Sequence, residues 1–400
     1  MIQILDKKKC CGCTSCANAC PKAAISMLPD EEGFLYPKVN INLCIDCGIC
    51  NKVCPVEHKP LPTNGNLKSY ALRIKENEVL MGSTSGGFVT PLVKYVLAHN
   101  GVVCAASYDK AFKVKHTIVE RTFEGGEDDL SLIRGSKYVQ SSLDDCFVKI
   151  KEYLEQDRMV CFVGTTCQVA GLKAFLHKDY EQLITVDLVC HGTPSPKLWD
   201  KYLDYQKEKY HSEIREVSFR NKTYGYHSGT MKICFANGKT YYGSARVDYM
   251  LKSFFSEIAS RPICYQCPFK TLERCSDFTI YDCWHAAQLV PGLEDDDKGY
   301  TNVIVQSEKG FNVLMQIRDS YEMYPVDTKK AVELDGIMVT CAAKPHPKRS
   351  EFYVGIDGRT MLEQVQKYIP VNLKDRAIES MKGLLYRMGI FQVAKKVLKR

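Results

Sequence analysis

Hydrophobic and polar residues follow two different periods along the chain, and these periods alternate from residue 70 onward. Short apolar runs such as GVVCAASYD (101–109), MVCFVGT (159–165) and LITVDLVCHG (183–192) are typical of buried strands. Between them, SSLDDCFVKIKEYLEQ (141–156) and PSPKLWDKYLDYQKEKY (194–210) have apolar residues at helical spacing. This alternation predicts an α/β body built around a mixed sheet.

Three segments depart from that alternation. Residues 214–244 contain EVSFRN, TMKICFA and KTYYGSA between turns with Gly or Asn, which indicates an insertion of β-hairpins. VEHKPLPTNGNLK (56–68) has the prolines and the Asn-Gly pair of a linker. The pattern after residue 345 is mostly helical and basic. We therefore expect a small N-terminal domain, a larger body and a helical tail.

Cysteine changes this picture most, because the chain has 20 cysteines in 400 residues. Otherwise the composition, 45% hydrophobic and 25% charged, is that of a globular protein with two or three cores. The opening MIQILDKKKCCGC has no apolar signal-peptide core, and no run of eighteen apolar residues occurs. We expect a cytoplasmic protein without a transmembrane segment, whose reduced cysteines are available as metal ligands.

The formal net charge of +7 is concentrated at one end of the chain. Residues 371–400 have eight basic and two acidic side chains, so the rest is almost neutral. This distribution argues against nucleic-acid binding, which needs basic residues across a folded face. The tail LLYRMGIFQVAKKVLKR (384–400) combines apolar residues at helical spacing with basic residues. It suits either an anionic membrane surface or a helix packed on the body.

Eight cysteines form two copies of the motif C-x2-C-x2-C-x3-C-P, thirty-four residues apart. In two-cluster ferredoxins the first three cysteines of a run hold one 4Fe-4S cluster, and the fourth holds the other. The predicted ligand sets are Cys10, Cys13, Cys16 and Cys54 for one cluster, and Cys44, Cys47, Cys50 and Cys20 for the second. Zinc also accepts four thiolates, but the duplication and the prolines favour clusters. Cys11 lies outside the motif.

Four stretches of the body have candidate chemistry. In STSGGFVTPLVKYVL (83–97), two glycines precede a helix, where free N–H groups suit a phosphate or an electron-rich ring, or simply a tight turn. RGSKYVQS (134–141) suits either an anion-binding site or a solvent-exposed turn. VGTTCQVAGL (163–172) and VDLVCHG (186–192) each have a cysteine after a buried strand.

Two ligand sets compete for a third metal site. The local set is Cys264, Cys267, Cys275 and Cys283; the distributed set is Cys167, Cys190, Cys264 and Cys267. The distributed set is favoured because the carboxyl ends of neighbouring strands meet at one edge of an α/β sheet. The remaining cysteines of the body are predicted to be small buried hydrophobic residues: Cys104, Cys146, Cys161, Cys234 and Cys341.

Together these stretches resemble the coenzyme F-420 hydrogenase/dehydrogenase beta-subunit family. The resemblance covers residues 68–310 and rests on YALRIKENEVLMGSTSGGFVTPL, GSKYVQSSL, GTTCQVAGL, VDLVCHGTPSPKLW and RPICYQCPFKTLERCSDFTIYDCW. It implies FAD bound beside a 4Fe-4S cluster, and it favours the distributed set because typical members lack a counterpart of Cys275. Thr166, Cys283 and His285 depart from the family pattern, so the resemblance does not identify the substrate of this chain.

The resulting expectation is a multidomain chain of mixed α+β and α/β type. Residues 1–60 form the two-cluster ferredoxin domain, and residues 68–150 the flavin-binding N-terminal part of the family. Residues 151–345 form its C-terminal part with the third cluster, and residues 346–400 a helical basic tail.

The function expected from the resemblance is a ferredoxin-linked iron–sulfur flavoprotein reductase. The flavin candidates are Ser85, Gly86, Gly87, Arg134, Ser136 and Lys137, and the candidate proton donors are His191, Asp282 and His285. The expected partners are a redox protein, such as a ferredoxin or a reductase, and a small-molecule or lipid-linked substrate, one option being related to envelope polysaccharides. The alternatives are an electron-transfer subunit that docks on a separate catalytic protein and a non-redox module with structural zinc.

Overall fold

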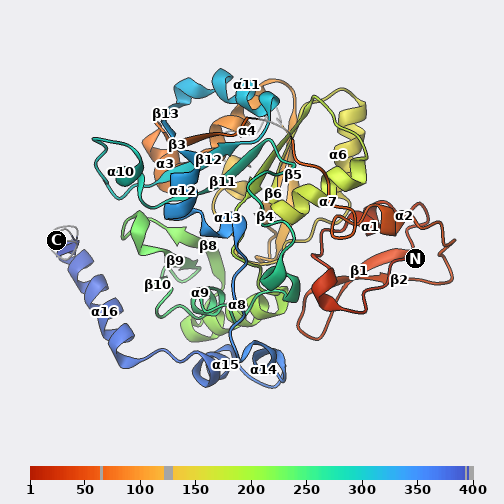
Figure 1. The fold of residues 1–400 in the computed structure, drawn as a ribbon. Coiled ribbons are helices and arrows are strands. Elements are labelled where there is room, and N and C mark those ends of the chain that lie inside the picture. Colours follow the sequence, from red (N-terminus) through yellow and green to blue (C-terminus); the bar gives the residue numbers. More distant parts are fainter. Residues whose placement is uncertain (64–65, 121–128, 392–393, 396–400) are drawn as a thin grey trace.

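The N-terminal module is a duplicated unit at one side of the molecule (Figure 1). The computed structural model describes residues 1–63, 66–120, 129–391 and 394–395. β1 (Ile25–Pro29) and β2 (Leu35–Val39) form an antiparallel hairpin, flanked by α1 (Ser15–Asn18) and α2 (Ile49–Lys52). The repeat extends to the backbone: Gly12 and Thr14 have positive φ in the first cysteine run, and Asp46 and Gly48 have it in the second.

The body is built on a mixed sheet that has eight strands within the described residues. Their order is β13 (Tyr321–Val326), β3 (Lys68–Ile74), β12 (Tyr300–Val305), β11 (Phe278–Cys283), β7 (Leu183–Leu188), β6 (Val160–Thr165), β4 (Val102–Tyr108) and β5 (Val114–Glu120). The four strands β11, β7, β6 and β4 are parallel, and every other pairing is antiparallel. The mixed sheet predicted from the alternation of apolar runs is confirmed.

Helices cover both faces of this sheet, as Figure 1 shows. α4 (Val89–Ala98) and α11 (Glu308–Gln316) bury apolar side chains in one core, and α6 (Cys146–Glu155) and α7 (Thr166–Leu176) in the other. α7 begins directly after β6, and a capping box between Thr165 and Gln168 fixes its start. The local sequence thereby places Cys167 at the carboxyl end of β6.

The predicted hairpin insertion is also confirmed. β8 (Ile214–Asn221), β9 (Thr230–Phe235) and β10 (Thr240–Ser244) form an antiparallel sheet that packs on α8 (Pro196–Tyr210) and α9 (Tyr249–Phe255). Trp199 and Tyr202 of α8 are fully buried against Met231 and Met250. The described chain after residue 345 is mainly helical, as expected.

The other helices connect or extend these layers. They are α3 (Asn77–Gly82), α5 (Asp129–Ile133), α10 (Ala286–Leu289), α12 (Thr328–Asp335), α13 (Ile337–Thr340), α14 (Arg349–Tyr353), α15 (Met361–Tyr368) and α16 (Leu373–Arg387). Short 3-10 helices span Lys7–Lys9, Tyr226–Ser228, Pro262–Gln266 and Arg318–Ser320. Among the described residues, every helix is too short or too polar to cross a bilayer.

The body cysteines do not all follow the prediction. Cys104, Cys146 and Cys161 are buried, as expected. The prediction is wrong for Cys341, which is exposed after α13, and for Cys234, which is only half-buried. Burial alternates along this part of β9, so the Cys234 side chain lies on the wetter face.

Candidate redox site

Each of two small cavities in the N-terminal module is lined by four cysteines of the two C-x2-C-x2-C-x3-C-P motifs. Cys10, Cys13, Cys16 and Cys54 line the inner cavity, and Cys20, Cys44, Cys47 and Cys50 line the outer cavity. Each set takes three cysteines from one run and the last cysteine from the other run, which is the crossed arrangement of two-cluster ferredoxins. The inner four are buried, whereas Cys47 of the outer set is exposed.

Backbone amides already point at some of these sulfur atoms. The N–H of Ile2 donates to Cys50 Sγ at 3.2 Å, and the N–H of Ala24 donates to Cys20 Sγ at 3.3 Å. Burial and the neighbouring thiol of Cys10 raise the pKa of Cys16 to about 12. Sulfur atoms packed this closely away from water need a cationic partner to carry negative charge, so the donor set fits a metal cluster.

A much larger cavity, of about 800 Å³, opens at the carboxyl edge of the main sheet. The ends of β6, β7 and β11 line it, together with residues 133–141 and all of residues 83–90 except Gly86. The segments 227–229 and 244–246, at the strand ends of the small sheet, complete the wall. The cavity therefore lies where parallel strands of an α/β sheet usually bind their ligands.

The inner end of the large cavity brings together the distributed cysteine set. Cys167, Cys190, Cys264 and Cys267 all line it. Burial, followed by the thiols of Cys190 and Cys167, raises the pKa of Cys264 well above its ordinary value. Among the described residues, no three acidic, histidine or cysteine side chains meet closely enough for one metal ion. A four-iron cluster is larger than one ion, so its ligands lie farther apart.

The two cysteines that belong only to the local set, Cys275 and Cys283, lie outside the lining of the large cavity. Cys275 is buried in the hydrophobic core beneath α6 and α7, and Cys283 is buried at the end of β11 in a separate apolar cluster. Along the described chain, neither residue therefore shares the lining of the large cavity with Cys264 and Cys267.

The predicted flavin residues converge on one wall, with one exception. Ser85, Gly87, Arg134, Ser136 and Lys137 line the large cavity. Ser136 also ties its loop to the glycine turn, because its N–H donates to Thr84 Oγ1 at 2.9 Å. The Arg134 Nε is buried and has no hydrogen-bond partner in the described structure, so the wall holds a spare cationic donor.

Gly86 is the exception, because it faces the sheet. A Cβ at this position would lie 2.3 Å from Leu72 O and 2.6 Å from Thr301 N. The glycine is therefore required by close packing of the turn on β3 and β12, which is the simpler of the two interpretations given to this motif.

The three candidate proton donors have different surroundings. His191 lines the large cavity, contacts the Glu257 carboxylate through Nε2 and lies beside Phe254. Asp282 also lines the cavity, but it is ion-paired with Arg220 at 3.1 Å. His285 lies outside the lining, with its Nδ1 2.6 Å from Asp335.

Two buried cationic residues were missed by sequence reasoning, and one of them, Arg220, lines the large cavity. Arg220, from β8, stacks 4.7 Å from Trp284 and keeps a buried Nη2 without a partner in the described structure. Lys222 donates to the carbonyl oxygens of Leu80 and Ser85, and burial lowers its pKa to about 7. Arg220 and Lys222 are two residues apart in EVSFRNK, so a strand places both on one face. Their burial depends on the contact between the two sheets.

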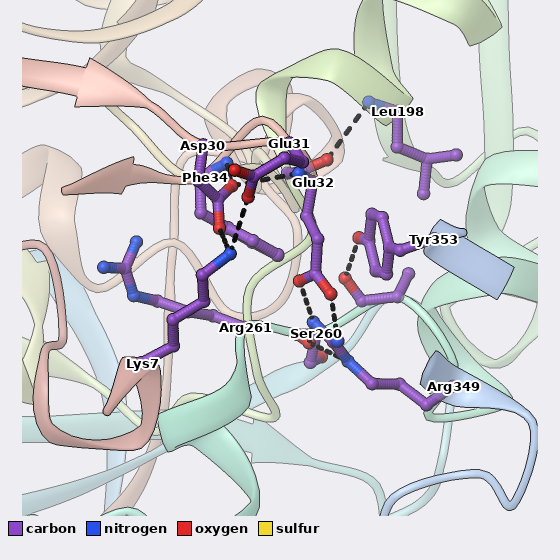
Figure 2. A network of polar contacts seen from close by, with 12 residues as sticks. Lys7, Asp30, Glu31, Glu32, Phe34, Leu198, Ser260, Arg261, Arg349 and Tyr353 are labelled. Atoms are coloured by element: carbon purple, nitrogen blue, oxygen red, sulfur yellow. Dashed lines mark hydrogen bonds and ion pairs between the residues drawn. The ribbon is translucent and has the colours of Figure 1, made fainter. Parts of the chain in front are cut away.

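One buried arginine joins the N-terminal module to the body (Figure 2). Arg261 is 0% exposed and donates from Nε to Cys10 O at 2.7 Å and from Nη2 to Cys10 Sγ at 3.4 Å. Its guanidinium lies 3.9 Å from the Tyr36 ring. Its own carbonyl accepts from the N–H of Cys264 at 2.9 Å. A single residue therefore contacts the inner cysteine set and the Cys-x-x-Cys loop.

Cys11 occupies the same junction. It lies between the inner cavity and the large cavity, and it is part of the walls of both. A hydrogen bond to Cys13 raises the pKa of Cys11 well above its usual value, and Cys11 also bonds to Cys167. Cys11, which lies outside the ferredoxin motif, thus contacts a cysteine of the inner set and a cysteine of the distributed set, as Arg261 does.

Two family models match separate parts of the chain. Residues 157–329 match the C-terminal region of the beta subunit of coenzyme F420 hydrogenase/dehydrogenase, and residues 9–58 match the 4Fe-4S dicluster domain. The chain is 25% identical over 351 residues to a coenzyme F420-dependent sulfite reductase of Methanocaldococcus jannaschii, covering 83% of this chain and 50% of that protein. It therefore spans half the length of that relative.

Other proteins match as well. An uncharacterized protein of the same organism is 23% identical over 342 residues, which cover 77% of this chain and 86% of that protein. A chain in a structure of the F420-reducing [NiFe] hydrogenase complex from Methanosarcina barkeri has a TM-score of 0.42 at 16% identity, covering 78% of this chain and 95% of that chain. The chain thus combines a 4Fe-4S dicluster domain at residues 9–58 with a region at residues 157–329 that matches the C-terminal region of coenzyme F420 hydrogenase/dehydrogenase beta subunits, and it is an iron–sulfur protein related to coenzyme F420-dependent oxidoreductases.

Proposed function

We propose that this chain is an iron–sulfur flavoprotein oxidoreductase that passes electrons between ferredoxin-type clusters and a flavin in the large cavity. The observation that carries this proposal is the junction at Cys11 and Arg261. There Cys11 bonds to Cys13 of the inner set and to Cys167 of the large cavity, and Arg261 contacts Cys10 and Cys264. A ferredoxin module that served only as a passenger would not need this contact.

The proposed ligands are the three cysteine sets that line the cavities. They are Cys10, Cys13, Cys16 and Cys54; Cys20, Cys44, Cys47 and Cys50; and Cys167, Cys190, Cys264 and Cys267. Arg261 supports the inner set through its N–H···S bond, and Lys270 donates to the carbonyl of Cys190 beside the third set. These cationic donors offset the negative charge of the thiolates.

The wall of residues 83–90 and 133–141 is the proposed flavin site. Arg134 and Lys137 supply positive charge for phosphate groups, and Ser85 and Ser136 supply hydroxyl donors. When bound, a flavin accepts single electrons and releases them in pairs. The name of the sulfite reductase suggests coenzyme F420 as a candidate substrate. A second flat ring would fit at the side of the cavity with Arg220 and Trp284.

Proton delivery is assigned to His191. Its ring lines the cavity, and its contact with the Glu257 carboxylate fixes the ring orientation. Asp282 is the weaker candidate because Arg220 and the Tyr226 hydroxyl already occupy its carboxylate oxygens. The third candidate, His285, lies outside the cavity lining.

Anaerobic quantitation of iron, sulfide and flavin tests this proposal. We expect about twelve irons per chain, because each 4Fe-4S cluster contributes four, together with one flavin. Cys190→Ser should lose about four irons, whereas the matched variant Cys275→Ser should lose none. Eight irons with one zinc, or a chain without flavin, would contradict the proposal.

A second candidate function is an electron-transfer subunit that docks on a separate catalytic protein. The outer cysteine set favours it, since Cys47 is exposed and Ile41, Leu43 and Ile45 beside it are 70%, 51% and 59% exposed. Exposed apolar residues around a redox site are typical of a docking face. Substrate turnover by the isolated chain with an artificial reductant would exclude this role as the sole function.

A further inference from the structure

The long C-terminal helix α16 turns an apolar stripe toward the solvent. Leu373, Ala377, Met381, Leu384 and Met388 recur every three or four residues and so share one face, which we call the outer stripe. Leu373 is 83% exposed, and Met381, Leu384 and Met388 are 54%, 51% and 60% exposed. None of the residues of α16 is buried. An amphipathic helix on a globular body normally turns this face inward.

The opposite face of α16 is polar and holds the helix on the body. Ser244 donates to Glu379 from its hydroxyl at 2.6 Å and from its N–H at 3.1 Å. Lys382 pairs with Glu379 at 3.1 Å, and the Tyr386 ring packs 4.9 Å from Tyr224. The outer stripe therefore faces outward because the polar face is already occupied, and Figure 1 places α16 at the margin of the molecule.

The exposed charges on α16 are of one sign. Lys374, Arg376 and Arg387 are exposed, whereas the acidic residues Asp375 and Glu379 are half-buried. Residues 371–400 carry eight basic and two acidic side chains in all. Apolar residues beside exposed basic residues, on one helix that lies along a surface, are the pattern of an interfacial membrane helix.

We propose that α16 docks this protein on an anionic lipid surface. The outer stripe inserts among the acyl chains at the interface, and Lys374, Arg376 and Arg387 contact anionic headgroups. The polar contacts of α16 fix its orientation relative to the large cavity, since Ser244 both holds α16 and lines that cavity. The cavity wall at residues 244–246 is thereby held near the lipid. This inference does not depend on the proposed cofactors.

Vesicle sedimentation with the full chain tests the proposal. We expect binding to vesicles of phosphatidylcholine mixed with phosphatidylglycerol, and at least tenfold weaker binding to phosphatidylcholine alone. The double variant Met381→Glu/Leu384→Glu should weaken binding by at least about tenfold, because it removes two inserting side chains. Arg376→Gln and Arg387→Gln should each weaken binding about fivefold.

The matched control is Leu61→Glu/Val354→Glu, which makes the same change of charge at residues 84% and 72% exposed elsewhere. This control should bind like the wild type. Thermal unfolding of both double variants should match that of the wild type, since α16 has no buried residue. Absence of binding to anionic vesicles, or unchanged binding of Met381→Glu/Leu384→Glu, would overturn the proposal. A dimer that the same variant dissociates, without vesicle binding, would instead show an interface between two copies.

Discussion

At the scale of single residues, Arg261 shows how one charge can be buried without a carboxylate partner. Its donors are taken by the carbonyl and the sulfur of Cys10 and by Gln140 Oε1, and its flat face lies on Tyr36. An unpaired buried guanidinium would be costly, but a thiolate cluster at Cys10 supplies the negative charge that it lacks. Arg261 is therefore a positioning residue for the inner cysteine set.

We predict that Arg261→Lys lowers the reduction potential of one cluster. The lysine keeps the positive charge but cannot donate to Cys10 O and Cys10 Sγ together, and loss of an N–H···S bond destabilises the reduced cluster. Redox titration followed by electron paramagnetic resonance measures this directly. Arg274→Lys, a change at another buried arginine, which pairs with Asp187, should leave that potential unchanged. A shift common to every cluster would contradict a local effect.

Lys137 gives a pH prediction. Burial lowers its pKa to about 8, so the ammonium is mostly present at pH 7 and is lost as the pH rises through 8. Since the cation is the form that attracts phosphate, flavin affinity should fall between pH 7 and pH 9, by about tenfold for one charge-assisted hydrogen bond. Fluorescence titration of the flavin-free chain with FAD measures this.

Lys137→Gln should bind FAD more weakly at pH 7 and should abolish the decline in this range. The exposed Lys110→Gln is the matched control and should retain it. A wild-type affinity that stays constant to pH 9 would place the phosphate elsewhere.

At the scale of elements, α7 approaches the N-terminal module at a glycine. A Cβ on Gly171 would lie 2.8 Å from Cys13 Cβ and 3.0 Å from Cys13 Sγ. Alanine is favoured over glycine within a helix by about 1 kcal/mol, but overpacking costs about 1–3 kcal/mol. The contact with Cys13 decides whether an alanine at position 171 stabilises or destabilises the chain, because a cluster ligand has little freedom to move.

Gly171→Ala should therefore destabilise the chain and weaken the attachment of the inner cluster. Thermal unfolding and iron content after dialysis against a chelator are the measurements. Gly358→Ala is the matched control, since the nearest atom to its Cβ would be 3.8 Å away. A Gly171→Ala protein as stable as the wild type would mean that α7 can move away from the module.

Elements were predictable where local pattern fixes them. β6 and β7 are continuous apolar runs, and the helix after β6 has its cap in the sequence, so the position of Cys167 at a strand end followed directly. The placement of Gly86 could not be foreseen, because its neighbours Leu72 and Thr301 come from distant strands. The outward face of α16 was equally hidden, since Ser244 and Tyr224, which hold its polar side, belong to the small sheet and the turn beside it.

At the scale of the whole molecule, the junction between module and body was beyond sequence reasoning. The cysteine motif predicts which residues share a cavity within residues 1–60, because spacing alone determines it. Which cavity faces the body depends on the shapes of the two surfaces that meet. Arg261, Gln140 and Gly171 of the body lie against the module on the side of the inner cavity. The side chains that meet there are more than a hundred residues apart, and no short-range pattern relates them.

The contact between Glu32 and Arg349 has a consequence for synthesis of the protein. The two terminal guanidinium nitrogens of Arg349, Nη1 and Nη2, donate to the Glu32 carboxylate at 2.6 and 2.5 Å, across 317 residues of chain (Figure 2). At about 5–20 residues per second, Arg349 is made about 15 to 60 s after Glu32. During this delay the N-terminal module emerges without its docking partner, so the cysteines of both runs are accessible before the body that covers the inner set is complete.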